Sequence, residues 1–315
     1  MKRRGVICFI FCIIMCSSID VTLKLTSLSL NALQLCFWRF LCGGLFCLPS
    51  AVKAMRNVRK PIKVTALYPM LFSGFLMVVL STGLYQVALS IGKASVVSVL
   101  YSCSPIFVAV AAWLMMGEKI RWDTVLSSAL YLVAVFVLLL SKGGSTSPLS
   151  CILILLSAGL LAVYNVLGQS WVERFPPSVY VSFTFIFGAI ELLGVIGISH
   201  IPMAADAARG LGIEVLADIP LKANINGRMI PVLLYVGIVA TGMNFLSMQV
   251  ATKELSAITT SFIFYFKLIF APFLAWLVLG EQIDSAMLAA MVLVFAALTV
   301  KTLMGRKMRK TGSKG

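Results

Sequence analysis

The feature that most constrains this fold is a series of apolar stretches, each about twenty residues long, along nearly the whole chain. A helix needs about 20 apolar residues to cross the ~30 Å hydrocarbon core of a bilayer. Lipid offers the backbone no hydrogen-bond partners, so such a stretch is expected to be a helix. The sequence therefore predicts an all-α membrane protein. We place ten transmembrane helices, at 5–25, 31–52, 66–90, 94–116, 121–141, 149–171, 178–199, 229–252, 256–279 and 284–304.

The composition also favours a membrane protein. Of the 315 residues, 60% are hydrophobic and 12% are charged, whereas soluble domains usually contain about 25% charged residues. Most links between the expected helices are too short to hold a soluble domain. The exception is a longer, polar loop at 200–228, which we expect outside the cytoplasm and in which 203–217 has the pattern of a short surface helix.

The net charge of +15 indicates topology rather than nucleic-acid binding. If the N-terminus is cytoplasmic, eighteen of the 26 Lys and Arg residues fall on the inside and six on the outside, and Arg39 and Lys267 lie within helices. The positive-inside rule produces such a bias. Both termini are therefore expected in the cytoplasm. The basic and apolar N-terminus resembles a signal peptide, but it continues without an A-x-A site, so we expect it to remain as the first helix.

The chain aligns with itself at an offset of 163 residues. Residues 85–120, "YQVALSIGKASVVSVLYSCSPIFVAVAAWLMMGEKI", lie over residues 248–283, "MQVATKELSAITTSFIFYFKLIFAPFLAWLVLGEQI", with thirteen identities in 36 positions. Each repeat contains five predicted crossings, an odd number, so the second copy enters the membrane from the opposite side. We therefore predict two inverted five-helix repeats, 1–145 and 146–315, around a central cavity. Many secondary transporters have this arrangement.

Three segments carry a family resemblance: "FWRFLCGGLF" at 37–46, "SPIFVAVAAWLMMGE" at 104–118 and "APFLAWLVLGE" at 271–281. With the five-plus-five pattern, they resemble the EamA-type branch of the drug/metabolite transporter superfamily. The resemblance implies a carrier of small metabolites, such as amino acids and their derivatives, in the cell inner membrane, where several members are exporters. The chain departs from the family pattern in "CSSID" at 16–20, in Lys267 and in the long loop at 200–228.

Lys267 stands near the middle of the ninth predicted helix, where its repeat counterpart is Ser104. A lysine at the bilayer centre costs at least ~2.5–3.5 kcal/mol on insertion scales, so it should face the protein interior. One interpretation is a set of internal ion pairs, such as Asp20 with Arg39 and Glu191 with Lys267. The other is that at least one of these charges faces the central cavity. We favour the second, because buried ion pairs often do no more than offset their own desolvation.

In that interpretation, Lys267 binds a substrate carboxylate or phosphate. Glu191 and Asp20 are proton-coupling candidates, because a carboxyl group in a medium of low dielectric can exchange protons near working pH. Other aromatic and polar side chains are expected to reach the same cavity. The substrate-binding candidates besides Lys267 are Tyr101, Phe264, Ser104, Arg39, Asn165 and Asn244, with Gln86, Gln169 and Gln249 as further polar groups. The alternative for each is packing or an interhelical hydrogen bond.

Two Gly-Glu pairs and two prolines mark helix ends and bends. Gly117–Glu118 and Gly280–Glu281 are interpreted as helix ends, with a left-handed glycine and a carboxylate at the start of the following helix. Pro105 and Pro272 are expected to kink the fourth and ninth helices.

The chain has no Walker, HExxH or GxSxG motif and no paired Cys/His cluster, so neither a metal, another cofactor nor an enzyme activity is expected. We predict a secondary active transporter, in the export direction, of an amino acid or related carboxylate. Two alternatives stay open: an exchanger of phosphorylated or other anionic metabolites through Lys267 and Arg39, and a non-transporting scaffold or channel. The expected partners are a small-molecule substrate and the lipid bilayer, without nucleic acid, for a monomer or homodimer.

Overall fold

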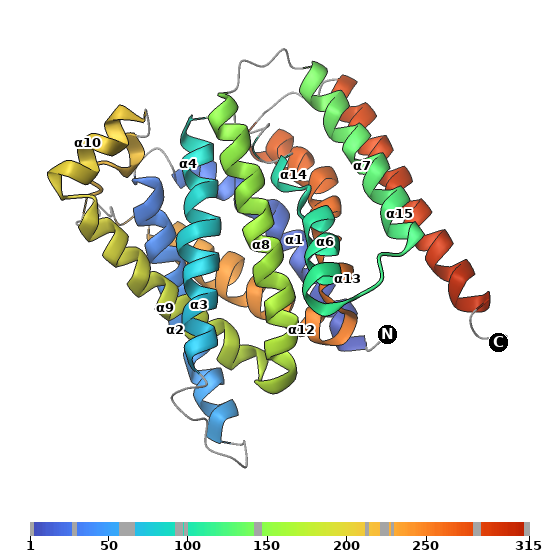
Figure 1. The fold of residues 1–315 in the computed structure, drawn as a ribbon, viewed down its shortest axis with the longest axis horizontal. Coiled ribbons are helices and arrows are strands. Elements are labelled where there is room, and N and C mark those ends of the chain that lie inside the picture. The colour runs from blue at the N-terminus through green and yellow to red at the C-terminus, as the bar shows by residue number, and fades with distance from the viewer. Residues whose placement is uncertain are drawn as a thin grey trace.

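The computed structural model describes residues 3–26, 30–56, 67–91, 97, 100–141, 147–211, 214–220, 227, 230–279 and 285–311. Within these ranges every regular element is a helix, and the helices pack into one bundle (Figure 1). The prediction of an all-α chain is therefore confirmed for the part of the chain that is described.

Among the described elements, seven helices have 17 residues or more, and several of the predicted membrane helices are built from consecutive pieces. The first half contains α1 (Arg3–Thr26), α2 (Ala32–Arg56), α3 (Tyr68–Gly74), the π-helix η2 (Phe75–Thr82), α4 (Gly83–Ile91), α6 (Ser104–Met116) and α7 (Trp122–Ser141). The second half contains α8 (Pro148–Arg174), α9 (Pro177–Ile198), α10 (Pro202–Gly210), the 3₁₀-helix η3 (Glu214–Leu216), α11 (Ile230–Leu234), the π-helix η5 (Tyr235–Met243), α12 (Asn244–Leu255), α13 (Ala257–Ser261), α14 (Ile263–Leu279) and α15 (Ser285–Thr311).

Helical residues occupy all ten predicted stretches. Among the residues that the structure describes, five helical stretches are long and apolar enough to cross a membrane: Ala32–Arg56, Tyr68–Ile91, Pro148–Arg174, Pro177–Ile198 and Ile230–Leu255. Shorter apolar helices lie at Ser104–Met116, Trp122–Val137 and Leu288–Val300. The chain is therefore a multi-pass membrane protein.

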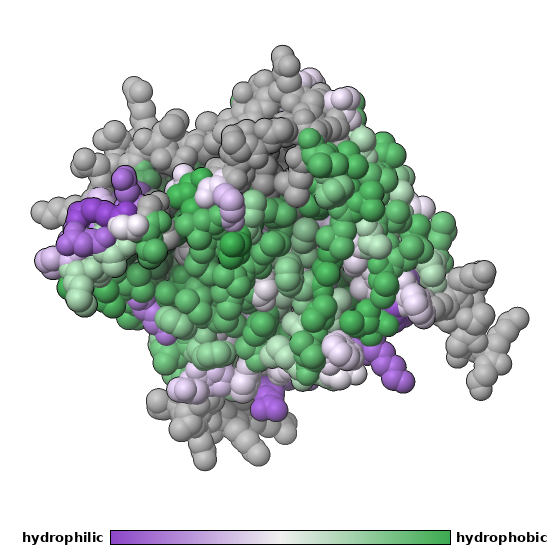
Figure 2. All heavy atoms as spheres, turned by 45° about the horizontal axis from the view of Figure 1, so that its top comes forward, coloured by the Kyte–Doolittle hydropathy of each residue, from purple (hydrophilic) through white to green (hydrophobic). Residues whose placement is uncertain are grey.

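The outer surface is suited to lipid. Large apolar side chains point outward from the peripheral pair α7 and α15, including Phe136 at 61% exposure and Val292 at 68%. Figure 2 shows apolar side chains spread over most of the visible face, with hydrophilic side chains gathered toward its margins. An apolar surface of this extent needs a hydrocarbon environment, because soluble monomers rarely expose such large apolar patches.

The contacts between the two halves occur in matched sets. Helix α2 packs against α9, and α7 packs against α15 along its length (Figure 1). Helix α1 packs against α14 and α12, while α8 packs against α6 and α4. In the predicted repeats α1 corresponds to α8, α6 to α14, and α4 to α12. The contact of α1 with α14 therefore corresponds to that of α8 with α6, and the contact of α1 with α12 corresponds to that of α8 with α4.

Two π-helical segments, η2 and η5, lie where the halves cross. Segment η2 packs against α9, and η5 packs against α2. Where π-helical turns meet α-helical turns, the change of hydrogen-bond spacing leaves a backbone carbonyl that needs another donor. The hydroxyl of Thr82 donates to the Met77 carbonyl at 2.9 Å, and that of Thr241 donates to the Val236 carbonyl at 2.7 Å. The same type of side chain thus satisfies a carbonyl five residues earlier in both segments.

Glycines let the backbones approach at these crossings. A β-carbon at Gly188 of α9 would lie 2.5 Å from Val78 Cγ2 and 2.8 Å from the Gly74 carbonyl oxygen. A β-carbon at Gly43 of α2 would lie 2.9 Å from the Gly237 carbonyl oxygen. Small residues allow this close packing of membrane helices. The two crossings therefore tolerate no side chain at these positions without a shift of the helices.

The polar loop contains a shorter helix than predicted. Helix α10 ends at Gly210, and the short 3₁₀ turn η3 follows it in the described part of the loop. Glycine is a poor helix residue and favours a helix end, which explains why 203–217 does not form one continuous helix. The Arg209 guanidinium binds Asp206 at 2.9 Å and also binds Asp218.

Candidate functional site

Two helix breaks frame the candidate site. Residues 102–103 form a turn before α6, and Phe262 separates α13 from α14. Hydroxyl groups satisfy carbonyls at both breaks, since Ser104 Oγ donates to Tyr101 O at 2.5 Å and Ser261 Oγ donates to Ile258 O at 2.8 Å. Interrupted membrane helices are common at transporter binding sites.

The fourth predicted helix is interrupted directly before Pro105, by a break instead of a kink. Pro105 lies in the first turn of α6, after the break, and so it begins a helix instead of bending one. A proline is well tolerated there because the first turn of a helix has no intrahelical partner for its N–H groups. The side chain of Pro272 lies outside the described residues.

Lys267 is buried, with 4% of its surface exposed. Its Nζ lies 5.8 Å from the centroid of the Tyr101 ring. That ring packs at 4.8 Å against Tyr85 and edge-on at 6.0 Å against Phe264. An ammonium within about 6 Å of an aromatic ring is attracted to the negative face of the ring. We call Lys267, Tyr101, Phe264 and Tyr85 the ammonium–aromatic cluster.

This cluster unites several of the residues singled out in the sequence. At the offset of 163, Tyr101 corresponds to Phe264 and Ser104 corresponds to Lys267. The structure brings the first pair together, because the rings of Tyr101 and Phe264 pack edge-on at 6.0 Å. Ser104 binds the backbone of Tyr101, and Lys267 lies beside the Tyr101 ring. Tyr85 was not singled out, since it is one of several aromatics on apolar helices. The sequence feature that could have identified Tyr85 is its position as the first residue of the aligned segment 85–120.

Arg39 makes its polar contact on η5. The guanidinium Nε of Arg39 donates to Thr241 Oγ1 at 2.8 Å, and the guanidinium carbon lies 4.9 Å from the Phe40 ring. Arg39 is itself 7% exposed. The contact fastens α2 to η5, so this side chain has a structural role that was not foreseen.

Asn244 is held by thiols of α1. Its Nδ2 donates to Cys16 Sγ at 3.3 Å, and its backbone carbonyl accepts from Cys12 Sγ at 3.3 Å. The cysteine face of α1 therefore packs as small polarizable side chains. Within the described ranges, no group of three or more His, Cys, Asp or Glu residues is arranged to hold a metal ion.

Asn165 on α8 and Gln249 on α12 are two further buried amides. They are 1% and 0% exposed, and none of their four amide atoms has a hydrogen-bond partner in the described chain. A β-carbon at Gly168 would lie 2.8 Å from Gln249 Oε1, which places that amide against α8. Buried polar groups normally have partners, so these amides are suited to bind water or a ligand.

Glu191 lies on α9 and is half-buried. Its Oε2 is buried without a hydrogen-bond partner, and it forms no ion pair with any described residue. The pairing of Glu191 with Lys267 is therefore not present. The side chain of Asp20 lies outside the described residues, so its pairing with Arg39 stays a prediction.

Gly117 ends α6 as expected. Its φ is +67°, its N–H donates to the Trp113 carbonyl at 3.1 Å, and the Glu118 N–H donates to the Ala112 carbonyl at 3.3 Å. This hydrogen-bond pattern is a Schellman motif, which favours glycine because of the positive φ. The pair Gly280–Glu281 lies outside the described residues.

The carboxylate of Glu118 does not lie where we predicted it. It accepts a hydrogen bond from Gln169 Nε2 at 3.0 Å, while the first turn of α7 carries Asp123. Gln169 Oε1 in turn accepts from the Ala257 N–H at 2.5 Å. Gln169 thus joins the end of α6 to the start of α13, so its polar atoms serve helix packing instead of a cavity.

Comparison with known proteins gives consistent results. The model of the EamA-like transporter family matches residues 3–140 and 148–303. An uncharacterized transporter of Clostridium kluyveri is 26% identical over 300 residues, covering 93% of this chain and 91% of that protein. The uncharacterized transporter YdfC of Bacillus subtilis is 24% identical over 253 residues, covering 79% of this chain and 74% of that protein. A solved crystal structure with 17% identity covers 98% of this chain and 99% of its own at a TM-score of 0.71, which shows a shared fold.

Proposed function

Because the chain belongs to the EamA-like transporter family, we propose that it is a secondary active transporter of a small, carboxylate-bearing metabolite such as an amino acid. The relatives in Clostridium kluyveri and Bacillus subtilis are both named transporters. The sequence carries no ATP-binding motif, so the energy comes from an ion or substrate gradient. Transport runs outward, from a protein in the cell inner membrane with both termini in the cytoplasm.

The proposed architecture is ten transmembrane helices in two inverted five-helix repeats. Three observations support it: the alignment at an offset of 163 residues, the two stretches matched by the family model, and the contacts that recur with the halves exchanged. Inverted halves can exchange inward-open and outward-open shapes around one site. Substrate therefore binds in alternation from the two sides.

The observation that carries the proposal is the buried Lys267 ammonium beside the Tyr101 ring. A buried cation in a membrane protein is costly and usually functional. We assign the ammonium to the substrate carboxylate and the Tyr101 and Phe264 rings to its apolar part. Asn165 then supplies hydrogen bonds to a polar group of the substrate, for which it has unused donors and an acceptor.

Access to this site requires movement, because only 4% of Lys267 is exposed in the structure. The breaks at residues 102–103 and at Phe262 lie directly beside the cluster. Breaks in helices are natural hinges, since they interrupt the hydrogen-bond ladder. We place the gating movement at these two positions.

Replacement of Lys267 tests the proposal. A thermal-shift screen of a metabolite library with the wild-type protein in detergent should identify carboxylates that stabilise it and do not stabilise Lys267→Met. In proteoliposomes, the same compounds should show saturable, counter-substrate-stimulated uptake by the wild type and none by the variant. Lys253→Met, at an exposed lysine in the last turn of α12, should transport normally.

The outcomes separate the alternatives. Stabilisation by phosphorylated compounds alone would favour the exchanger of anionic metabolites, which we place second because Arg39 already binds Thr241. Wild-type uptake without saturation or counterflow would indicate a channel, and no uptake at all a scaffold. Normal transport by a folded Lys267→Met protein would refute the role of the ammonium.

A further inference from the structure

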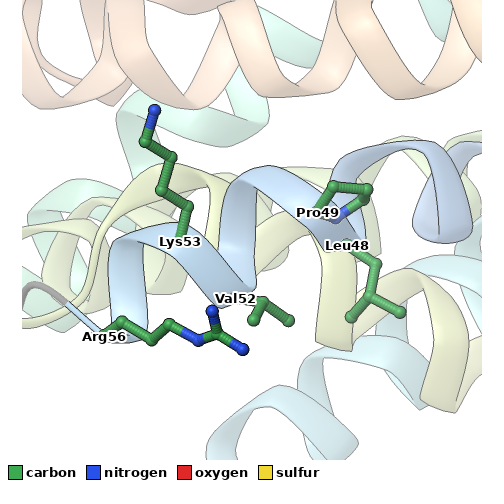
Figure 3. Close-up of a pocket in the computed structure, with 5 residues that line it drawn as sticks. All are labelled: Leu48, Pro49, Val52, Lys53 and Arg56. Atoms are coloured by element: carbon green, nitrogen blue, oxygen red, sulfur yellow. The ribbon is translucent and has the colours of Figure 1, made fainter.

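A cavity at the end of α2 lies apart from the ammonium–aromatic cluster. It has a volume of about 550 Å³ and is lined by Leu48, Pro49, Val52, Lys53 and Arg56 (Figure 3). This volume lies within the range of roughly 300–1,000 Å³ found for small-molecule sites. Three lining residues are apolar and the last two are cations, so the lining changes from apolar to basic along the helix axis.

The periodicity of α2 creates this change. Residues four apart lie on one face of a helix, and Leu48 and Val52 therefore form a stripe that ends in Arg56. Pro49 and Lys53 form the neighbouring stripe. Figure 3 shows Val52 and Arg56 on one side of the helix and Lys53 extending from the other. Each apolar stripe thus ends in a positive charge.

The two cations lie along α2 at the depth in the bilayer where lipid headgroups are expected. Helix α2 has 25 residues, which corresponds to about 37 Å and exceeds the ~30 Å hydrocarbon core. Lys53 and Arg56 occupy its last turn, at the depth of the headgroups if the preceding residues span the core. One turn before the cavity, Leu45 and Phe46 are 50% and 44% exposed and continue the apolar surface.

Both cations are available to a ligand. Lys53 and Arg56 are exposed, and neither forms an ion pair with a carboxylate in the described part of the chain. Cations also favour a helix C-terminus by themselves. That preference explains the two cations, but it does not explain the cavity beside them.

We propose that this cavity binds an anionic phospholipid, with its phosphate at the Arg56 guanidinium and an acyl chain along Leu48 and Val52 on the same side of the helix. The Lys53 ammonium, on the neighbouring stripe, adds to the positive potential that attracts the headgroup. A phosphate ester accepts charge-assisted hydrogen bonds from a guanidinium. A free phosphate ion would leave the apolar lining without a partner, whereas a lipid covers it. Basic residues near the ends of membrane helices commonly attract anionic lipid.

Native mass spectrometry of the full chain in detergent tests the proposal, with dioleoyl phosphatidylglycerol as the probe and dioleoyl phosphatidylcholine as the neutral comparison. The double variant Lys53→Gln/Arg56→Gln should bind phosphatidylglycerol about thirtyfold more weakly, because each cation contributes about 1 kcal/mol and 1.4 kcal/mol is tenfold. The charge-retaining variant Lys53→Arg/Arg56→Lys should bind like the wild type. All proteins should elute alike in size exclusion.

A matched control distinguishes the cavity from general surface charge. Arg174→Gln/Lys253→Gln also removes two exposed cations from the last turns of helices, α8 and α12, away from the cavity. It should leave the affinity for phosphatidylglycerol unchanged. The proposal is overturned if both double variants lose affinity equally, if phosphatidylcholine binds as tightly, or if inorganic phosphate displaces the lipid at equal concentration. None of these measurements depends on transport.

Discussion

Substitution of Gly188 offers a direct measurement of how closely the halves pack. In Gly188→Ala, the new β-carbon would lie 2.5 Å from Val78 Cγ2 and 2.8 Å from the Gly74 carbonyl oxygen. Carbon atoms in contact normally lie about 3.5–4.0 Å apart, so α9 and η2 would have to separate by about 1 Å. The change is forced, because the Gly74 oxygen belongs to the backbone and cannot rotate away.

The expected loss of stability follows from two opposing effects. Overpacking of a well-packed interior usually costs about 1–3 kcal/mol. Alanine in place of glycine returns up to ~1 kcal/mol through helix propensity. We therefore expect the free energy of unfolding of Gly188→Ala to fall by about 1–2 kcal/mol. Gly194→Ala, on the same helix but with no atom within 4 Å of the new carbon, should leave it unchanged or raise it slightly.

Unfolding by sodium dodecyl sulfate in mixed micelles, followed by circular dichroism, measures this difference. The two variants share a helix and a chemical change, so their difference reports the crossing alone. Adding Val78→Ala to Gly188→Ala should restore only part of the loss, because the contacts with the β-carbon of residue 78 and with the Gly74 oxygen remain. Equal unfolding midpoints for Gly188→Ala and Gly194→Ala would refute the close approach of α9 and η2.

Two further predictions concern the proposed transport site and use the compound found in the screen. Glu191→Gln should keep counterflow in proteoliposomes but lose its response to an imposed pH gradient, because the amide cannot carry a proton; an identical response by the wild type and the variant would remove Glu191 from coupling. Asn165→Leu should leave the unfolding midpoint unchanged or higher, since its amide has no partner in the described chain and an apolar replacement of similar shape is nearly neutral. The same variant should transport more slowly if the amide binds substrate, and normal transport would show that it only packs.

The sequence was sufficient to predict the all-helical membrane fold. In lipid a helix satisfies its backbone within its own segment, so an apolar stretch of about twenty residues determines its own structure. The internal repeat was also informative, because segments that align in the two repeats are expected to occupy corresponding positions in the two halves of the fold. It aligned Tyr101 with Phe264, and the two rings meet at 6.0 Å.

The tertiary structure alone decided which polar side chains meet. Arg39 binds Thr241, 202 positions away, and Gln169 binds Glu118, 51 positions away. Neither pair was predicted, because such a contact depends on how two helices cross and rotate against each other. The π-helical segments and the crossing at Gly188 set that geometry, and both result from packing between segments that are distant in the chain. Helix formation is local in lipid, whereas helix packing is not, and this difference separates what could be predicted from what had to be observed.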